Sequence, residues 1–178
     1  MIEIEIKARA DHDATIKALK AAGAVFEKTA DQADIFYNAP DRDFGKTDEA
    51  LRLRRQGSAA YLTYKGKKLD TVSKTRKEIE VGVDSPEKIE EILLSLGFRK
   101  TYSVFKKRDI YHLKGAEVCV DRVDGLGDFV ELETIVDDMA GMDKKRDELI
   151  SLMRSLGIAG ELIRESYLEM LLEKNHEQ

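Results

Sequence analysis

The sequence predicts an α+β fold in which eight antiparallel strands close, or nearly close, into a β-barrel with flanking helices. Three observations lead to this expectation: apolar and charged residues alternate along many short stretches, the pattern occurs in two similar halves, and a helical pattern replaces it near the C-terminus. Alternation with a period of two is typical of a strand, because successive side chains leave opposite faces. Closing two such halves into one barrel removes exposed sheet edges.

The first strand is the clearest example of the alternation. Residues 2–9 have the sequence Ile-Glu-Ile-Glu-Ile-Lys-Ala-Arg, which puts three isoleucines on one face and two glutamates and a lysine on the other. Asp11 is then a favourable N-cap for a helix over residues 14–22, which Gly23 can end. The later strands are expected at residues 25–37, 51–55, 61–65, 74–83, 98–113, 117–123 and 129–136.

An internal repeat follows from the spacing of several motifs. Glu3-Ile4-Glu5-Ile6 is matched by Glu78-Ile79-Glu80-Val81, 75 residues later (78 − 3), and Tyr37 is matched by Tyr111, 74 residues later (111 − 37). In the second copy, Ser85-Pro86 supplies the cap and the first residue of the matching helix. The two copies therefore indicate two β-α-β-β-β halves.

The length and composition are those of one folded domain. The chain has 178 residues, of which 42% are hydrophobic, so it can bury one sizeable core. We expect a single domain over residues 1–178, with halves at about 1–73 and 74–136. A helical tail is expected from about 138 to 178, with its last helix over about 161–174.

The charge balance and the cysteine count limit the partners and the compartment. The formal net charge of −5 argues against general binding to nucleic acid or to an anionic membrane. The lone Cys119 cannot form an internal disulfide, which fits a reducing cytoplasm. No apolar run approaches the roughly 20 residues of a membrane span, and Glu3 stands where an export signal needs basic residues. We therefore expect a cytoplasmic protein.

Most strands carry charged residues on the face opposite their apolar residues. The acidic residues placed there by the alternation are Glu3, Glu5, Glu78, Glu80, Asp121, Glu131 and Glu133, and the basic ones are Lys7, Arg52, Arg54, Lys65, Arg76, Lys106 and Arg108. Grouped carboxylates attract hard divalent cations such as Mg²⁺ or Mn²⁺. Grouped arginines and lysines attract phosphate. A site with both groups suits a metal-bound polyphosphate.

A simpler interpretation is an ordinary half-exposed sheet whose charges face water. For any single strand this interpretation is the better one, because charged residues are mostly exposed. For the whole set it is weaker, since acids alternate tightly on some strands while arginines and lysines occupy others. Buried charges without pairing or water would be costly, so we expect a wet tunnel through the barrel and not a dry core.

Seven motifs occur in a fixed order along the chain. They are Glu3-x-Glu5-x-Lys7, Gln32-x-Asp34-x-x-Tyr37, Ala50-Leu51-Arg52-Leu53-Arg54, Leu62-Thr63-Tyr64-Lys65-Gly66, Arg76-x-Glu78-x-Glu80, Lys106-x-Arg108 and Asp121-x-Val123-x-x-Leu126-Gly127-x-Phe129-x-Glu131-x-Glu133. This ordered set resembles the CYTH family, the triphosphate tunnel enzymes that include class IV adenylyl cyclases and thiamine triphosphatases. The length and the Ser166-Tyr167-Leu168 segment are most similar to the class IV adenylyl cyclase-like branch.

The resemblance implies a role for each matching position. It implies that Glu3, Glu5, Glu131 and Glu133 hold one or two Mg²⁺ or Mn²⁺ ions, and that Lys7, Arg52, Arg54, Lys65, Arg76, Lys106 and Arg108 bind the triphosphate. It implies that Glu78, Glu80, Tyr37 and Tyr167 support the site, and that Glu5, Lys7 and Asp121 are catalytic. Asp121 is a weak candidate base, because a carboxylate among arginines and lysines should have a lowered pKa.

Three classes of function remain open at this point. The leading hypothesis is a metal-dependent enzyme, most similar to a class IV adenylate cyclase that converts ATP to cyclic AMP and pyrophosphate. A triphosphatase acting on tripolyphosphate, thiamine triphosphate or a nucleotide would use nearly the same contacts. A non-catalytic polyphosphate-binding module is a further alternative, although binding alone needs mainly the bases. The apolar faces of the C-terminal helices could cover the barrel or a partner chain, so a homodimer is possible.

Overall fold

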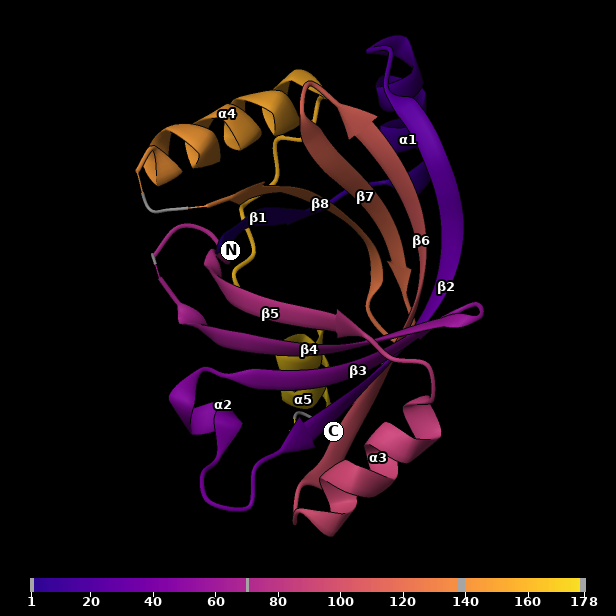
Figure 1. Cartoon of the computed structure of the whole chain (residues 1–178). Helices are drawn as coiled ribbons and strands as arrows, with labels where there is room; N and C mark the ends of the chain where they lie inside the picture. Colours follow the sequence, from indigo (N-terminus) through magenta and orange to yellow (C-terminus); the bar gives the residue numbers. More distant parts are fainter. Residues whose placement is uncertain (1, 70, 138–139, 177–178) are drawn as a thin grey trace.

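The computed structural model describes residues 2–69, 71–137 and 140–176, and its centre is a closed antiparallel barrel (Figure 1). Around the barrel the strands follow the order β1-β5-β4-β3-β2-β6-β7-β8. The predicted fold class is therefore confirmed. The strands are β1 (Ile2–Arg9), β2 (Val25–Asn38), β3 (Ala50–Gln56), β4 (Ala59–Lys68), β5 (Arg76–Gly82), β6 (Arg99–Leu113), β7 (Ala116–Val123) and β8 (Gly127–Val136).

The order of the strands shows how the two halves are combined. β1 pairs along its whole length with β8, from Ile2 opposite Val136 to Arg9 opposite Phe129. In the same way β5, the first strand of the second half, pairs with β4, the last strand of the first half. Each half thus gives its first strand to the other half. The long β2–β6 pairing completes the closure and leaves no free sheet edge.

Five helices surround the barrel in the described residues. They are α1 (His12–Ala21), α2 (Phe44–Thr47), α3 (Pro86–Ser95), α4 (Met142–Ser155) and α5 (Tyr167–His176). Two of them begin as the sequence predicts: the Asp11 side chain accepts a hydrogen bond from the Ala14 amide, and Ser85 caps α3 before Pro86. The short helix α2 lies between the strands predicted at residues 25–37 and 51–55.

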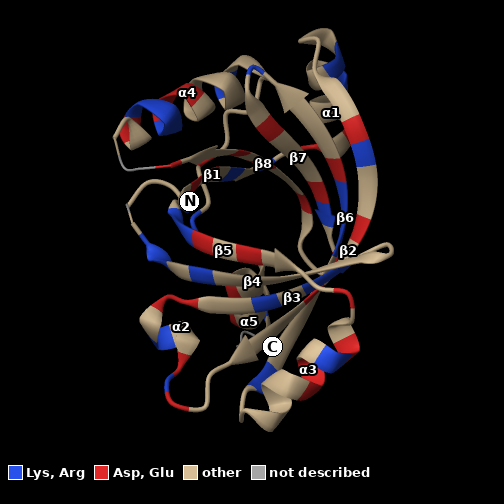
Figure 2. Cartoon of the chain, viewed as in Figure 1, with Lys and Arg blue, Asp and Glu red and all other residues tan. Residues whose placement is uncertain are grey.

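The apolar faces of several strands pack on these helices, whereas on β5 Ile79 and Val81 are each 56% exposed. α1 and α4 lie over β1, β7 and β8, where Ile4, Leu132 and Leu152 belong to one buried cluster. α3 packs against β3 and β6, with Leu53 and Leu93 in a second cluster. Because the apolar faces point outward to the helices, the charged faces point into the barrel. Figure 2 shows this distribution of charge along the strands.

The tail differs from the expectation in one respect. Its last helix begins at Tyr167 and not at about residue 161, because Ser166 and Glu169 form a capping box. The Glu169 amide donates to the Ser166 hydroxyl (3.1 Å), and the Ser166 amide donates to the Glu169 carboxylate (2.5 Å). The preceding residues are extended, and the Ile163 amide donates to the carbonyl of Lys7 (2.7 Å). Residues 138 and 139, the expected start of the tail, lie outside the described residues.

Among the described residues, no helix is long and apolar enough to cross a membrane.

The repeat supplies a matched test of what holds the barrel together. Ile4 and Ile79 occupy equivalent positions in the two copies, but Ile4 is fully buried beneath the helical layer whereas Ile79 is 56% exposed. We expect Ile4→Ala to lower the free energy of unfolding by about 2–5 kcal/mol, because it leaves a cavity in the core. Ile79→Ala should cost less than about 1 kcal/mol. Urea denaturation of both variants measures the difference, and equal losses would contradict this account of the core.

Candidate active site

The barrel encloses a cavity of about 570 Å³ that receives side chains from all eight strands. This volume is within the usual range for small-molecule sites, roughly 300–1,000 Å³. The predicted site residues that line it are Glu3, Glu5, Tyr37, Arg52, Arg54, Lys65, Arg76, Glu78, Glu80, Lys106, Arg108, Glu131, Glu133 and Tyr167. Two predicted residues, Lys7 and Asp121, are instead buried in the wall.

Two bidentate ion pairs fix arginines in the cavity wall. Arg54 donates to both oxygens of Asp34 (2.7 Å each), and Arg108 donates to both oxygens of Asp121 (2.7 and 2.6 Å). In each pair the partners are directly opposite one another on neighbouring strands. Burial alone would raise the pKa of Asp34 and of Asp121, but the adjacent positive charges outweigh it and lower both. Both carboxylates are therefore held in the charged form.

Asp121 accepts further hydrogen bonds beyond those of its arginine. The Lys106 ammonium lies 3.2 Å from Asp121 Oδ2, and the Tyr167 hydroxyl donates to the same oxygen over 2.9 Å. A carboxylate with a lowered pKa and this many donors has little tendency to accept another proton. The geometry thus gives Asp121 the role of orienting Lys106 and Arg108.

Three carboxylates from β1 and β8 come together and form what we call the acidic cluster: Glu5, Glu131 and Glu133. One carboxylate oxygen of each lies within 4.8 Å of the others. Burial, and then the charge of the nearby Glu3, raises the pKa of Glu133 well above its usual range. Arg108 donates to Glu131, but Glu5 and Glu133 add further carboxylate oxygens, and oxygen ligands are what a hard divalent cation such as Mg²⁺ or Mn²⁺ requires. The donor set of the acidic cluster therefore fits the metal that the sequence predicts.

The sequence prediction missed Lys74, which is central to the acidic cluster. Its ammonium lies 2.5 Å from Glu5 Oε1 and 3.7 Å from Glu131 Oε1, and its amide donates to the Glu5 carbonyl (3.0 Å). Burial alone would lower the pKa of Lys74, but these two carboxylates raise it. Lys74 lies in the turn before β5, two residues ahead of Arg76. The strand predicted over residues 74–83 already places Lys74 on the same face as Arg76, but the motif used to choose the site residues begins only at Arg76.

Glu3 is not one of the three carboxylates of the acidic cluster, although its charge acts on Glu133. It faces Lys65, whose ammonium is 3.6 Å from Glu3 Oε2 and 2.5 Å from Glu78 Oε1. Burial raises the pKa of Glu3, and the neighbouring Glu78 adds to this effect. The structure thus brings together three of the four predicted metal ligands. It places Glu3 beside Lys65 and Glu78, near the opening where β1 meets β5.

Arg52 on β3 and Arg76 on β5 are further bases of the cavity wall. Arg52 donates to the Thr63 hydroxyl (3.2 Å) and lies 3.5 Å from Glu80, which also accepts a hydrogen bond from Thr63 (2.7 Å). Arg76 is 3.5 Å from Asp48, a residue that follows α2. Glu80 is therefore placed to orient Arg52.

Lys7 has an environment unlike that of the other bases. Its ammonium donates to the carbonyl of Glu165 and lies 4.2 Å from the centre of the Tyr167 ring. Burial, with a further contribution from the charge of Lys74, lowers the pKa of Lys7 to about 7. Lys7 is fully buried by the extended segment before α5. The alternation of β1 predicts the face of Lys7 correctly but not that the tail covers it.

Tyr37 lies at the edge of the cavity, although its ring is buried among outer residues. It belongs to the cluster that contains Phe44, Leu53 and Leu93. Tyr167, by contrast, contacts three charged residues of the wall. Of the two tyrosines predicted to support the site, Tyr167 is therefore the one that contacts charged residues of the cavity wall.

The family of the chain follows from comparison with known proteins. Residues 1–167 match the CYTH domain, so the chain belongs to the CYTH family. A protein of Methanocaldococcus jannaschii whose name assigns it provisionally to the adenylate cyclases is 42% identical over 172 residues, which are 96% of this chain and 98% of that protein. The adenylate cyclase CyaB of Aeromonas hydrophila is 26% identical over 177 residues, or 97% of this chain and 90% of CyaB.

A solved structure supports the same assignment. The PH1819 protein of Pyrococcus horikoshii superposes with a TM-score of 0.90 at 40% identity, and the match covers 97% of this chain and 99% of that protein. The resemblance stated from the sequence motifs is thereby confirmed at the level of the family.

Lys74 offers a test of the acidic cluster. We expect Lys74→Met to bind Mn²⁺ at least several-fold more tightly, because the ammonium no longer competes for Glu5 and Glu131. In the absence of metal, the same change should lower the free energy of unfolding by about 3 kcal/mol, since Glu5 loses its cation. Titration calorimetry and urea denaturation measure the two effects. Lys77→Met, on the exposed face of β5, is the control, and unchanged Mn²⁺ affinity in Lys74→Met would exclude this role.

Proposed function

We propose that this protein is a divalent-metal-dependent enzyme that acts on a triphosphate inside the barrel, with ATP as the substrate and cyclic AMP and pyrophosphate as the products. The observation that carries the proposal is the arrangement of one cavity with carboxylates grouped at β1 and β8 and bases on the facing strands. Binding alone would need mainly the bases. The separate acidic cluster favours catalysis over a polyphosphate-binding module.

The bases suit a chain of phosphates because their donors are already held in place. Arg54 and Arg108 are fixed by bidentate pairs, and Arg52 by Thr63 and Glu80. Fixed arginines lose less side-chain freedom on binding, and their planar groups match phosphate oxygens. Lys65 and Lys106 add point charges to the same wall. These residues would bind the triphosphate and set which phosphorus faces the acidic cluster.

The acidic cluster would hold Mg²⁺ or Mn²⁺ through Glu5, Glu131 and Glu133. When bound, such an ion supplies activation of the attacking oxygen and neutralisation of phosphate charge. A protein general base fits the site less well, because the lowered pKa of Asp121 makes this carboxylate a weak base. The role of Asp121 is to position Lys106 and Arg108 against the substrate. Lys7, which lies behind this wall, would support it from the tail side.

The choice of the cyclase reaction is supported by the similarity to proteins named adenylate cyclases. In that reaction the 3′-hydroxyl of ATP attacks the α-phosphorus. A triphosphatase is the main alternative, since water attacking the terminal phosphorus would use the same ground-state contacts. The two reactions differ in which phosphorus lies beside the activated oxygen, a difference of about an ångström in substrate position.

A product assay distinguishes the candidates. Purified protein is incubated with Mg²⁺ or Mn²⁺ and either ATP or tripolyphosphate, and the products are separated by chromatography. We expect cyclic AMP and pyrophosphate from ATP. Orthophosphate without cyclic AMP would replace the cyclase proposal with the triphosphatase. Binding of tripolyphosphate without turnover would favour the binding module, and absence of binding would refute the site.

The repeat also provides a matched pair of variants for the metal. Glu5 and Glu80 are equivalent in the two copies, but Glu5 belongs to the acidic cluster and Glu80 orients Arg52. Glu5→Gln should reduce turnover at least 10³-fold, because it removes a metal ligand. Glu80→Gln should chiefly raise KM and leave the dependence on Mn²⁺ concentration unchanged. Circular dichroism checks the fold of both, and full turnover in Glu5→Gln would rule out the metal assignment.

A further inference from the structure

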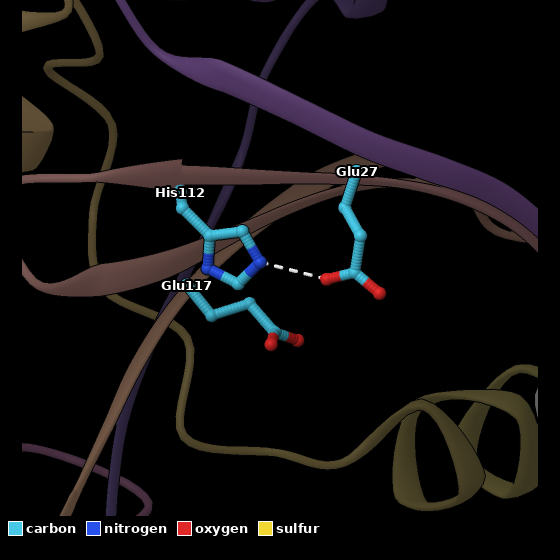
Figure 3. Close-up of side chains that lie close together, drawn as sticks. All are labelled: Glu27, His112 and Glu117. Atoms are coloured by element: carbon cyan, nitrogen blue, oxygen red, sulfur yellow. Dashed lines mark hydrogen bonds and ion pairs between the residues drawn. The ribbon is translucent and has the colours of Figure 1, made fainter.

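A second group of metal-binding side chains lies at the end of the barrel and takes no part in the proposed reaction. Glu27 on β2, His112 on β6 and Glu117 on β7 each offer one ligand atom, and these atoms lie within 4.8 Å of one another. Figure 3 shows the three side chains converging. The side chains of Glu27 and His112 are 39% and 50% exposed, so the group is open to solvent. We call these three residues the rim site.

The backbone directs all three side chains to the same place. His112 and Glu117 are directly opposite one another in the β6–β7 register. Glu27 is the extra residue of a β-bulge, where the β2–β6 register shifts between Phe26 and Lys28. A bulge at a barrel end re-aims a side chain. Here it turns the carboxylate of Glu27 towards His112, and their Oε2 and Nε2 atoms are 2.7 Å apart.

The rim site also continues into the acidic cluster. Glu117 is opposite Glu133 in the β7–β8 register, and Glu133 is opposite Glu5 in the β8–β1 register. Glu117, Cys119 and Glu133 likewise offer ligand atoms within 4.8 Å of one another. Glu27 and Glu117 both line the main cavity. Side chains that can serve as cation ligands therefore follow one another from the exposed end of the barrel to its interior.

The charges around the rim site leave room for a cation. Lys28 lies 2.8 Å from Glu27 Oε1, which leaves Oε2 on the side of His112. Within the described residues, Glu117 has no lysine or arginine partner, and its contact is the weakly donating thiol of Cys119 at 3.4 Å. The neutral imidazole of His112 and two carboxylates would then complete three ligands, with the remaining positions filled by water.

His12 has a similar environment, but a cationic side chain already occupies the space beside it. It also lies between two carboxylates, with Nδ1 3.0 Å from Asp13 and Nε2 2.8 Å from Asp109. There, however, the guanidinium of Arg122 already occupies the space, 3.0 Å from Nδ1 and 3.4 Å from Asp13. His12 is therefore a built-in comparison for His112.

We propose that Glu27, His112 and Glu117 form a second divalent-cation site, selective for ions that accept imidazole nitrogen, such as Zn²⁺ or Mn²⁺, over Mg²⁺. The selectivity follows from the ligands: the acidic cluster offers oxygen only, whereas the rim site offers nitrogen and oxygen. The two sites therefore differ in chemistry as well as in depth. The rim site does not depend on the proposed reaction.

Nuclear magnetic resonance of the histidine rings tests the rim site directly. The full chain, labelled with ¹⁵N-histidine and free of triphosphate, is titrated with Zn²⁺ at about pH 7.5. We expect the ring nitrogens of His112 to shift to metal-bound positions while those of His12 stay unchanged. Excess Mg²⁺ should not reproduce the shift. A His112 ring that does not respond to Zn²⁺, or that responds equally to Mg²⁺, would overturn the proposal.

Three variants separate this site from the interior one. His112→Gln should weaken Zn²⁺ binding at least tenfold by titration calorimetry, and the matched control His12→Gln should leave it unchanged. Glu5→Gln, which removes a ligand of the acidic cluster, should retain the His112 shift. Loss of the shift in Glu5→Gln would show that Zn²⁺ binds only in the interior and would refute the rim site. Failure of turnover with the shift intact would count against the proposed reaction alone.

Discussion

The structure depends on pairing the charges that its closed barrel buries. A charged group taken out of water costs several kcal/mol unless a partner and hydrogen bonds replace its hydration. Here Asp34 with Arg54, and Asp121 with Arg108, meet that need through short bidentate contacts between neighbouring strands. Because these pairs are directly opposite in the register, they also fix where the arginines stand. The ion pairs that offset the cost of burying these charges therefore also fix the positions of the arginines in the site.

The two halves of the chain share one backbone arrangement, but at equivalent positions one half carries an acidic residue and the other a basic one. The repeat spacing of 74 residues relates Asp34 to Arg108 (108 − 34), and each forms a bidentate pair with a residue of opposite charge on the next strand. The repeated backbone thus carries the acid on β2 in one copy and on β7 in the other. Together with the grouping of Glu131 and Glu133 on β8, this exchange brings acids and bases into contact around the cavity, as where Arg108 donates to Glu131.

Much of this arrangement was accessible from the sequence, because alternation determines which face each side chain takes. It correctly placed the lining residues of the strands, and the repeat correctly predicted two halves in one barrel. Alternation does not specify how deep a residue lies or what crosses above it, so it could not show that the tail buries Lys7. Lys74 lies on the charged face of the strand predicted over residues 74–83, but alternation alone does not show that it contacts Glu5 and Glu131. Asp34 was recognised as part of a motif, but its partner Arg54 depends on register, which only the fold supplies.

The tail is part of the site and not an attachment to the barrel. Its extended segment binds β1 through the Lys7 carbonyl and covers the Lys7 ammonium with the carbonyl of Glu165. Tyr167 then joins the tail to Asp121, the group that holds Arg108 and Lys106. A shift of the tail would thus change the donors around Asp121 and, through it, the position of two bases.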